Sequence, residues 1–133
     1  MHSTILLVED NPDVLSAFRK TLVKHGYRVR EATSGDDALE AFQDDPDIDL
    51  VLTDIVMPGE LQGTTLAKAL RKLRPDLPIV FMSGNTSEVT AQGDGILPQD
   101  IRLTKPVLRE ALLRAVTEAL SLGVRDSANS KEK

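Results

Sequence analysis

Residues 5–12 carry the sequence ILLVEDNP, in which four apolar residues run directly into two acids, an asparagine and a proline. An uninterrupted apolar run of this length is typical of a β-strand that is buried on both faces. Comparable runs lie at residues 48–52, where one aspartate interrupts, and at residues 79–82. Two further segments alternate apolar and polar side chains, which predicts less completely covered edge strands at residues 27–30 and 101–104.

Helical spacing fills the intervals between these strands. Gly93, Gly95 and Pro98 interrupt residues 84–100, so we expect only a short helix and a long loop there. Pro106 is suited to begin the last helix. Elsewhere apolar side chains recur three and four residues apart, as on one face of an amphipathic helix, in three sets: Val14, Leu15, Phe18 and Leu22; Leu66, Ala69, Leu70 and Leu73; and Leu108, Leu112, Val116 and Leu120.

Capping residues mark the ends of the first two helices. Asn11 is a favourable N-cap and Pro12 suits the first helical position, while Gly26 stands where that helix should end. Ser34, with Asp37 three residues later, resembles a capping box in which aspartate replaces the usual glutamate or glutamine. These signals place helices directly after the first and second strands.

Strand and helix therefore alternate five times, which predicts an α/β fold with a parallel sheet covered by helices on both faces. Three interior and two edge strands fit the flavodoxin-like (βα)5 doubly wound sheet with strand order 2-1-3-4-5. The 133 residues suffice for one domain. We expect that domain to span residues 1–122 and to be followed by a polar, disordered C-terminal tail at residues 123–133.

Composition excludes several classes of function. The chain has no cysteine and two histidines, which removes disulfides, thiolate chemistry and multi-histidine metal sites. A net charge of −5 and an aromatic content of 3% argue against direct nucleic-acid binding, which needs a basic patch and stacking side chains. No apolar run is long enough to span a membrane and no secretory signal precedes the first strand, so we expect a cytoplasmic location.

Functional side chains cluster at the predicted strand ends. In an open parallel sheet, sites form outside the carboxyl ends of the strands. Three carboxylates at one edge repel each other unless a cation neutralises them, and Mg²⁺ prefers such oxygen ligands. The residues that the strands end on, or that directly follow them, are Glu9, Asp10, Asp54, Ser83 and Lys105.

This donor set suits phosphoryl transfer, in which catalysis is mostly positioning and charge neutralisation. Lys105 can pair with a carboxylate and then with a phosphoryl oxygen, and Ser83 can donate a hydrogen bond to that oxygen. Asp54, which ends the central strand, is best placed to act as a nucleophile and form an aspartyl phosphate. Each residue taken singly has an ordinary structural explanation as a cap, a turn residue or a solvated charge. Four successive strand ends that all carry such residues favour a common site.

With these residues in place, the sequence resembles the receiver domain of two-component response regulators. The resemblance rests on the acidic pair after the first strand, the motif at residues 54–59, Ser83 with Gly84, and Lys105 with Pro106. It covers residues 4 to 122. Residues 75–84, which carry the sequence PDLPIVFMSG, and the stretch that leads to Pro106 are closest to receivers of hybrid histidine kinases.

The resemblance implies a role for each site residue. It implies that Asp54 accepts a phosphoryl group from the phosphohistidine of a histidine kinase or histidine phosphotransfer protein. It implies that Ser83 and Lys105 contact that group. By the same resemblance Mg²⁺ is held by Glu9, Asp10, Asp54 and the backbone carbonyl of Val56. The chain is then a switch that catalyses only its own phosphorylation and dephosphorylation, and partners dock near the first helix.

Three features depart from the family pattern. Arg102 stands where the family carries an aromatic switch residue, and we expect its guanidinium to stay at the surface, either in a partner contact or without a role. Val56 and Asn85 occupy positions that influence hydrolysis in the family, which favours slow to moderate self-dephosphorylation. The weak helix within residues 84–100 indicates an order–disorder switch or a face that is not used.

Other functions remain open on this fold. One is a pseudo-receiver that serves only for protein contacts, although every phosphorylation residue is present. Another is a Mg²⁺-dependent aspartyl-phosphate phosphohydrolase, which normally needs a second acid near the nucleophile that residues 54–56 do not offer. A flavin or nucleotide binder is disfavoured because no glycine-rich phosphate loop follows the first strand. The downstream target, the stimulus and the oligomeric state stay undetermined.

Overall fold

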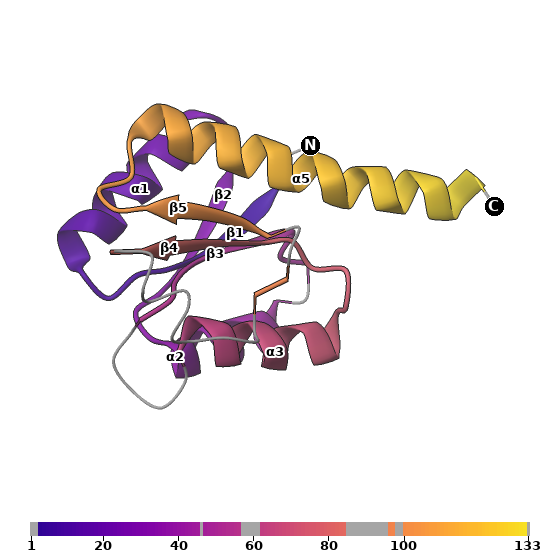
Figure 1. Ribbon diagram of the computed structural model, residues 1–133, viewed down its shortest axis with the longest axis horizontal. Coiled ribbons are helices and arrows are strands. Elements are labelled where there is room, and N and C mark those ends of the chain that lie inside the picture. The colour runs from indigo at the N-terminus through magenta and orange to yellow at the C-terminus, as the bar shows by residue number, and fades with distance from the viewer. Residues whose placement is uncertain (1–2, 46, 57–61, 85–95, 98–99, 133) are drawn as a thin grey trace.

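The computed structural model describes residues 3–45, 47–56, 62–84, 96–97 and 100–132, with side chains as far as residue 121. Its centre is one sheet of five parallel strands in the order β2-β1-β3-β4-β5 (Figure 1). This order confirms the predicted flavodoxin-like fold and its two edge strands. The strands are β1 Thr4–Val8, β2 Arg28–Ala32, β3 Leu50–Asp54, β4 Ile79–Ser83 and β5 Ile101–Thr104.

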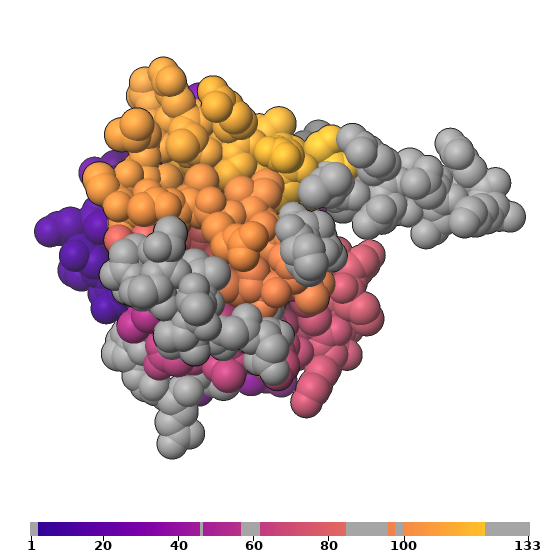
Figure 2. All heavy atoms as spheres, viewed as in Figure 1, coloured from indigo at the N-terminus to yellow at the C-terminus, as the bar shows by residue number. Residues whose placement is uncertain are grey.

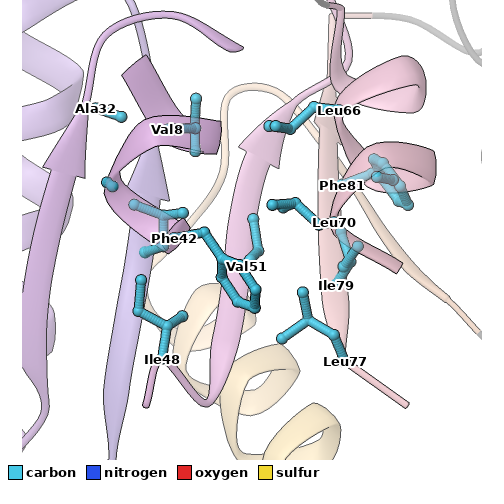
Figure 3. Close-up of a cluster of buried hydrophobic side chains, with 14 of the residues drawn as sticks. Val8, Ala32, Phe42, Ile48, Val51, Leu66, Leu70, Leu77, Ile79 and Phe81 are labelled. Carbon is cyan, nitrogen blue, oxygen red and sulfur yellow. The ribbon is translucent and has the colours of Figure 1, made fainter. Parts of the chain in front are cut away.

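Helices cover both faces of the sheet (Figure 1). On one face α1, Pro12–Lys24, and α5, Arg109–Glu132, pack with Leu7, Leu52 and Met82 into one buried cluster. On the other, α2, Gly35–Asp44, and α3, Gly63–Leu73, pack onto the alternate strand residues. Figure 3 shows this second cluster, with Phe42, Val51, Leu66, Leu70 and Phe81 between the helices and the sheet.

The three interior strands are buried on both faces, as their apolar runs predict. All five residues of β3 and of β4 are buried, whereas β5 alternates between partly buried and exposed positions. Edge strand β2 is likewise only partly covered. The central strands are therefore covered on both faces, and the edge strands less completely.

The predicted caps form, with one difference. Asn11 Oδ1 accepts hydrogen bonds from the backbone N–H groups of Asp13 at 2.9 Å and Val14 at 3.3 Å. Gly26 ends the turn after α1 with a φ of 91°, a conformation that favours glycine. Ser34 Oγ accepts from the Asp37 N–H at 3.1 Å.

The returning half of that capping box is not formed as predicted. Asp37 Oδ2 accepts a hydrogen bond from the Thr33 hydroxyl at 3.2 Å. Aspartate is one methylene shorter than the glutamate or glutamine that usually completes the box by reaching the N-cap N–H.

Two helical stripes differ from the prediction at their ends. Leu73 is 54% exposed, because the buried face of α3 runs through Gly63, Ala67 and Leu70 and passes to one side of it. Arg74, the residue after the helix, has its Cζ atom 5.7 Å from the centre of the Phe42 ring.

In α5 the first predicted positions lie outside the helix. The helix begins at Arg109, so Leu108 precedes it and is 71% exposed. Pro106 does not begin the helix but forms a cis peptide bond with Lys105.

Helix α5 continues through Glu132, and Figure 1 shows it extending past the sheet. Residues 123–132 contain no proline, so their backbone can continue a helix even though their composition is polar. The domain boundary at residue 122 remains a prediction. In the part of the chain that the structure describes, no helix combines the length and apolarity that crossing a membrane requires.

Candidate functional site

Three carboxylates meet at the carboxyl edge of the sheet. Parallel register places Val8 of β1 beside Thr53 of β3, so the residues that follow them, Glu9 and Asp54, come to the same edge. One carboxylate oxygen from each of Glu9, Asp10 and Asp54 lies within 4.8 Å of the others. Glu9 and Asp54 are buried, whereas Asp10 is exposed. The cluster thus opens to solvent through Asp10.

Lys105 reaches this cluster from the far edge strand. Its Nζ lies 2.7 Å from Asp54 Oδ1 and 3.2 Å from Glu9 Oε1. Its backbone N–H donates to the carbonyl oxygen of Ser83 at 2.7 Å, which continues the pairing of β5 with β4. The lysine side chain is 34% exposed. One ammonium group therefore serves two buried carboxylates and still faces solvent.

Asp54 and Glu9 differ in their hydrogen bonds. Glu9 accepts from the Asn11 N–H at 3.0 Å and from Lys105 Nζ. Among the described residues, neither carboxylate oxygen of Asp54 has a well-aligned hydrogen-bond donor, although Lys105 Nζ lies 2.7 Å from Oδ1 in an ion pair. A buried carboxylate without aligned donors, beside two more carboxylates, offers the oxygen ligands that fit a hard divalent cation. The residues present therefore suit Mg²⁺.

The carboxylates and the lysine shift each other's ionisation. Burial, together with the adjacent Glu9, raises the pKa of Asp54 to about 8, against the opposing effect of Lys105. Burial also acts to raise the pKa of Glu9, but Asp54, the Asn11 N–H and Lys105 outweigh it, so that pKa is lowered. The pKa of Lys105 is raised, because Asp54 and Glu9 outweigh the effect of its burial. Without a cation, Asp54 and Glu9 thus hold one proton between them near neutral pH.

The backbone around Asp54 is held by α3. The Gly63 N–H donates to the Ile55 carbonyl oxygen at 2.7 Å. A Cβ atom at Gly63 would overlap the Asp54 carbonyl oxygen and lie 2.8 Å from Ile55 Cα. The hydroxyl of Thr53 donates to that same Asp54 carbonyl at 3.0 Å. Sequence reasoning missed Gly63 and Thr53, since a close backbone approach leaves no mark in a single sequence beyond the glycine itself.

The other predicted residues lie near this edge. Ser83 is buried at the end of β4, the strand next to β3. Val56, two residues after Asp54, is 49% exposed. Arg102 is exposed on β5, in accordance with its expected surface position. Asn85 lies outside the described residues, as do residues 57–59 of the motif and most of the segment 84–100.

Comparison with known proteins agrees with this geometry. A family model described as the response regulator receiver domain matches residues 5–117. The chain belongs to the receiver domain family. Proteins of this family act in two-component signalling, where the receiver accepts phosphoryl groups. This receiver is 38% identical over 117 residues to the response regulator receiver protein CpdR of Brucella abortus, and the match covers 87% of the chain and 95% of CpdR.

Other relatives are longer proteins. The receiver is 38% identical to the sensor kinase CckA of Brucella abortus, and the match covers 89% of the chain but 12% of CckA. It is 33% identical to the transcriptional regulatory protein GlrR of Escherichia coli, of which it spans 26%. The similarity to CckA fits the expected likeness to receivers of hybrid kinases.

Solved structures show the same fold. A response regulator receiver protein from Sinorhizobium medicae superposes with a TM-score of 0.82 at 33% identity, covering 92% of this chain and 97% of that one. NtrX from Brucella abortus gives a TM-score of 0.88 at 27% identity, covering all of this receiver and 30% of NtrX. The order of strands and helices is therefore that of known receivers.

Proposed function

We propose that this receiver accepts a phosphoryl group on Asp54 from the phosphohistidine of a histidine kinase or histidine phosphotransfer protein. The observation that carries the proposal is the position of the Asp54 carboxylate, which is buried at the end of β3 with Lys105 Nζ 2.7 Å from Oδ1 and has no well-aligned donor among the described residues. Glu9, which is equally buried, has both its oxygens occupied by donors. A new bond to an Asp54 oxygen therefore competes with no well-aligned donor from the described residues, whereas each Glu9 oxygen already accepts one.

Mg²⁺ would be held by Glu9, Asp10, Asp54 and the backbone carbonyl of Val56. When bound, the ion supplies positive charge that offsets the carboxylates and the phosphoryl oxygens. The acidic cluster supports this assignment for its three side chains. The exposed position of Asp10 leaves a route for the ion from solvent.

The transfer itself uses groups of this chain. One carboxylate oxygen of Asp54 attacks the phosphorus and forms an acyl phosphate, while the phosphorus–nitrogen bond of the phosphohistidine breaks and its electron pair stays on the imidazole. Lys105, which already lies 2.7 Å from Asp54, provides a positive charge for a phosphoryl oxygen. The Ser83 hydroxyl provides a hydrogen bond to another. Hydrolysis of the acyl phosphate returns the carboxylate.

The product acts through protein contacts. An aspartyl phosphate adds charge at the sheet edge, and family relatives use such a change to alter partner binding. We therefore expect the partners to be a kinase or phosphotransfer protein and a downstream protein, in the cytoplasm, without direct nucleic-acid binding. We expect the receiver to catalyse only its own phosphorylation and dephosphorylation, with phosphodonors as its small-molecule substrates.

Intact-mass measurement tests the proposal. The protein is incubated with acetyl phosphate, with and without Mg²⁺, and quenched at times from seconds to hours. We expect the mass of one phosphoryl group to be gained by the native protein and by the exposed-site control Asp36→Asn, but not by Asp54→Asn. The gain should require Mg²⁺. Phosphorylation that persists in Asp54→Asn, or no gain at any time, would contradict the proposal.

A further inference from the structure

A buried ion pair joins the end of α3 to the start of β5. Arg71 donates from Nη1 and Nη2 to the two carboxylate oxygens of Asp100, at 2.9 and 2.7 Å. Its Nε and Nη2 also donate to the Leu77 carbonyl oxygen, at 3.3 and 3.1 Å. Asp100 accepts the Leu97 N–H at 2.7 Å as well. The two charged side chains are 13% and 3% exposed, so water competes little for them.

Such a pair fixes geometry more than it adds stability. The desolvation penalty of burying two charges offsets most of their attraction. A bidentate contact from a guanidinium group, however, sets both the distance and the plane of the carboxylate. Here the contact holds three segments together: the last turn of α3, the loop before β4, and the residue that precedes β5. At the other edge of the sheet the ion pairs of β2 are more exposed: Arg19 with Glu31 at 3.0 Å, and Arg30 with Asp44 at 3.7 Å and Asp45 at 3.9 Å.

Strand β5 is a short edge strand. It has four residues, its pairing partner in the described sheet is β4, and its partly buried residues Ile101 and Leu103 pack against the core cluster beneath α5. Asp100 directly precedes the strand and Lys105 directly follows it. In the space-filling view, the orange atoms of this region lie between α5 and the pink atoms around the end of α3 (Figure 2).

We propose that Arg71 and Asp100 are positioning residues for Lys105. The ion pair holds the start of β5 in register with β4, and the strand carries that register to the lysine at its other end. The ammonium group is thereby kept 2.7 Å from Asp54. This inference rests on the proposed function, because it concerns the lysine that assists phosphoryl transfer. Arg71 itself acts only through Lys105.

A double-mutant cycle tests the inference. The rate of phosphorylation by acetyl phosphate at saturating Mg²⁺ is compared among the native protein, Arg71→Met, Lys105→Ala and the double variant. We expect Arg71→Met to be slower by about tenfold, less than the roughly hundredfold that a 1 Å misplacement can cause, because Arg71 acts only through Lys105. In the Lys105→Ala background the same substitution should change nothing. Arg19→Met, which removes the ion pair with Glu31 at the opposite edge, should react at the native rate.

A second measurement does not depend on the chemistry. Hydrogen exchange of the Lys105 N–H, which donates to Ser83, should become faster in Arg71→Met while exchange in β3 stays unchanged. If Arg71→Met does not fold, Asp100→Asn replaces it, because asparagine keeps the side-chain shape and removes the charge. Unchanged exchange at Lys105, or rate losses that multiply in the double variant, would overturn the inference. A native rate for Lys105→Ala would instead contradict the proposed role of the lysine.

Discussion

The charge of Asp54 is less well compensated by solvent and hydrogen bonds than the charges of Glu9 and Asp10. Asp10 faces solvent, and Glu9 accepts two hydrogen bonds. Asp54 is as buried as Glu9, but it has a single cation within reach and no well-aligned donor among the described residues. Burial and the adjacent Glu9 raise the pKa of Asp54 to about 8, whereas for Glu9 the effect of burial is outweighed by Asp54, the Asn11 N–H and Lys105, so its pKa is lowered. A carboxylate in this state is destabilised as an anion, and a metal ion or a new covalent bond relieves it.

The effect of Asp54 on stability should depend on pH. Its pKa is higher in the folded protein, so between pH of about 4 and about 8 the folded state holds a proton that the unfolded state has lost. Stability from this proton is present at low pH and is lost as the pH rises through that window. In the presence of a metal chelator, the Asp54→Asn variant should therefore be more stable than the native protein, and the difference in unfolding free energy should grow as the pH rises. At pH 8 we expect this difference to be on the order of 1–3 kcal/mol.

Urea unfolding curves followed by circular dichroism at pH 4, 6 and 8 measure this difference. The variant Asp36→Asn, which changes an exposed aspartate at the start of α2, serves as the control. Its unfolding free energy should not rise relative to that of the native protein as the pH increases. An Asp54→Asn advantage that is constant or shrinks as the pH rises would contradict the assigned burial of the charge.

At the level of elements, the start of α3 packs closely against the end of β3, the strand that carries Asp54. The substitution Gly63→Ala places a methyl group against the Asp54 and Ile55 backbone, which cannot move without shifting the site. We expect a loss of about 1–3 kcal/mol in unfolding free energy, the usual range for overpacking a buried site. Phosphorylation of Asp54 should also slow. Lys72→Ala, an exposed change later in the same helix, should leave both quantities near native.

The two ends of the leucine stripe in α5 should behave differently. Leu112 is 1% exposed and packs with Leu7 and Leu52 in the core, whereas Leu108 is 71% exposed and precedes the helix. Leu112→Ala should lower the unfolding free energy by about 2–4 kcal/mol through cavity formation. Leu108→Ala should change it by less than about 0.5 kcal/mol. Similar losses for both variants, measured by urea unfolding, would show that the helix begins earlier than Arg109.

The burial of residues at helix ends was the feature that the sequence predicted least well. The 3.6-residue period correctly identifies the faces of α1, α3 and α5, because buried or partly buried apolar residues recur along each helix. Leu73 and Leu108 fit the same period but are exposed, since burial at a helix end depends on what lies opposite. The capping of α1 by Asn11 could be predicted because it involves only neighbouring residues.

For the whole molecule, strand type and strand ends were sufficient to predict the sheet order and the set of residues at its carboxyl edge. Both follow from local patterns combined with the rule that parallel strands end on one side. The burial of Glu9 beside an exposed Asp10 could not be predicted, because it depends on the final position of β1 against β3. The Arg71–Asp100 pair joins residues 29 positions apart and has no local pattern at all.

The proton that Glu9 and Asp54 hold between them has a consequence for calorimetry. A divalent cation that binds both carboxylates must expel it, so magnesium uptake near pH 7 should release about one proton to the buffer. The heat of titrating the metal-free protein with magnesium should then differ between Tris and PIPES in proportion to their ionisation enthalpies, and Asp54→Asn should abolish the difference. Acidification and magnesium depletion should thus both favour the metal-free protein, in which Glu9 and Asp54 share a proton.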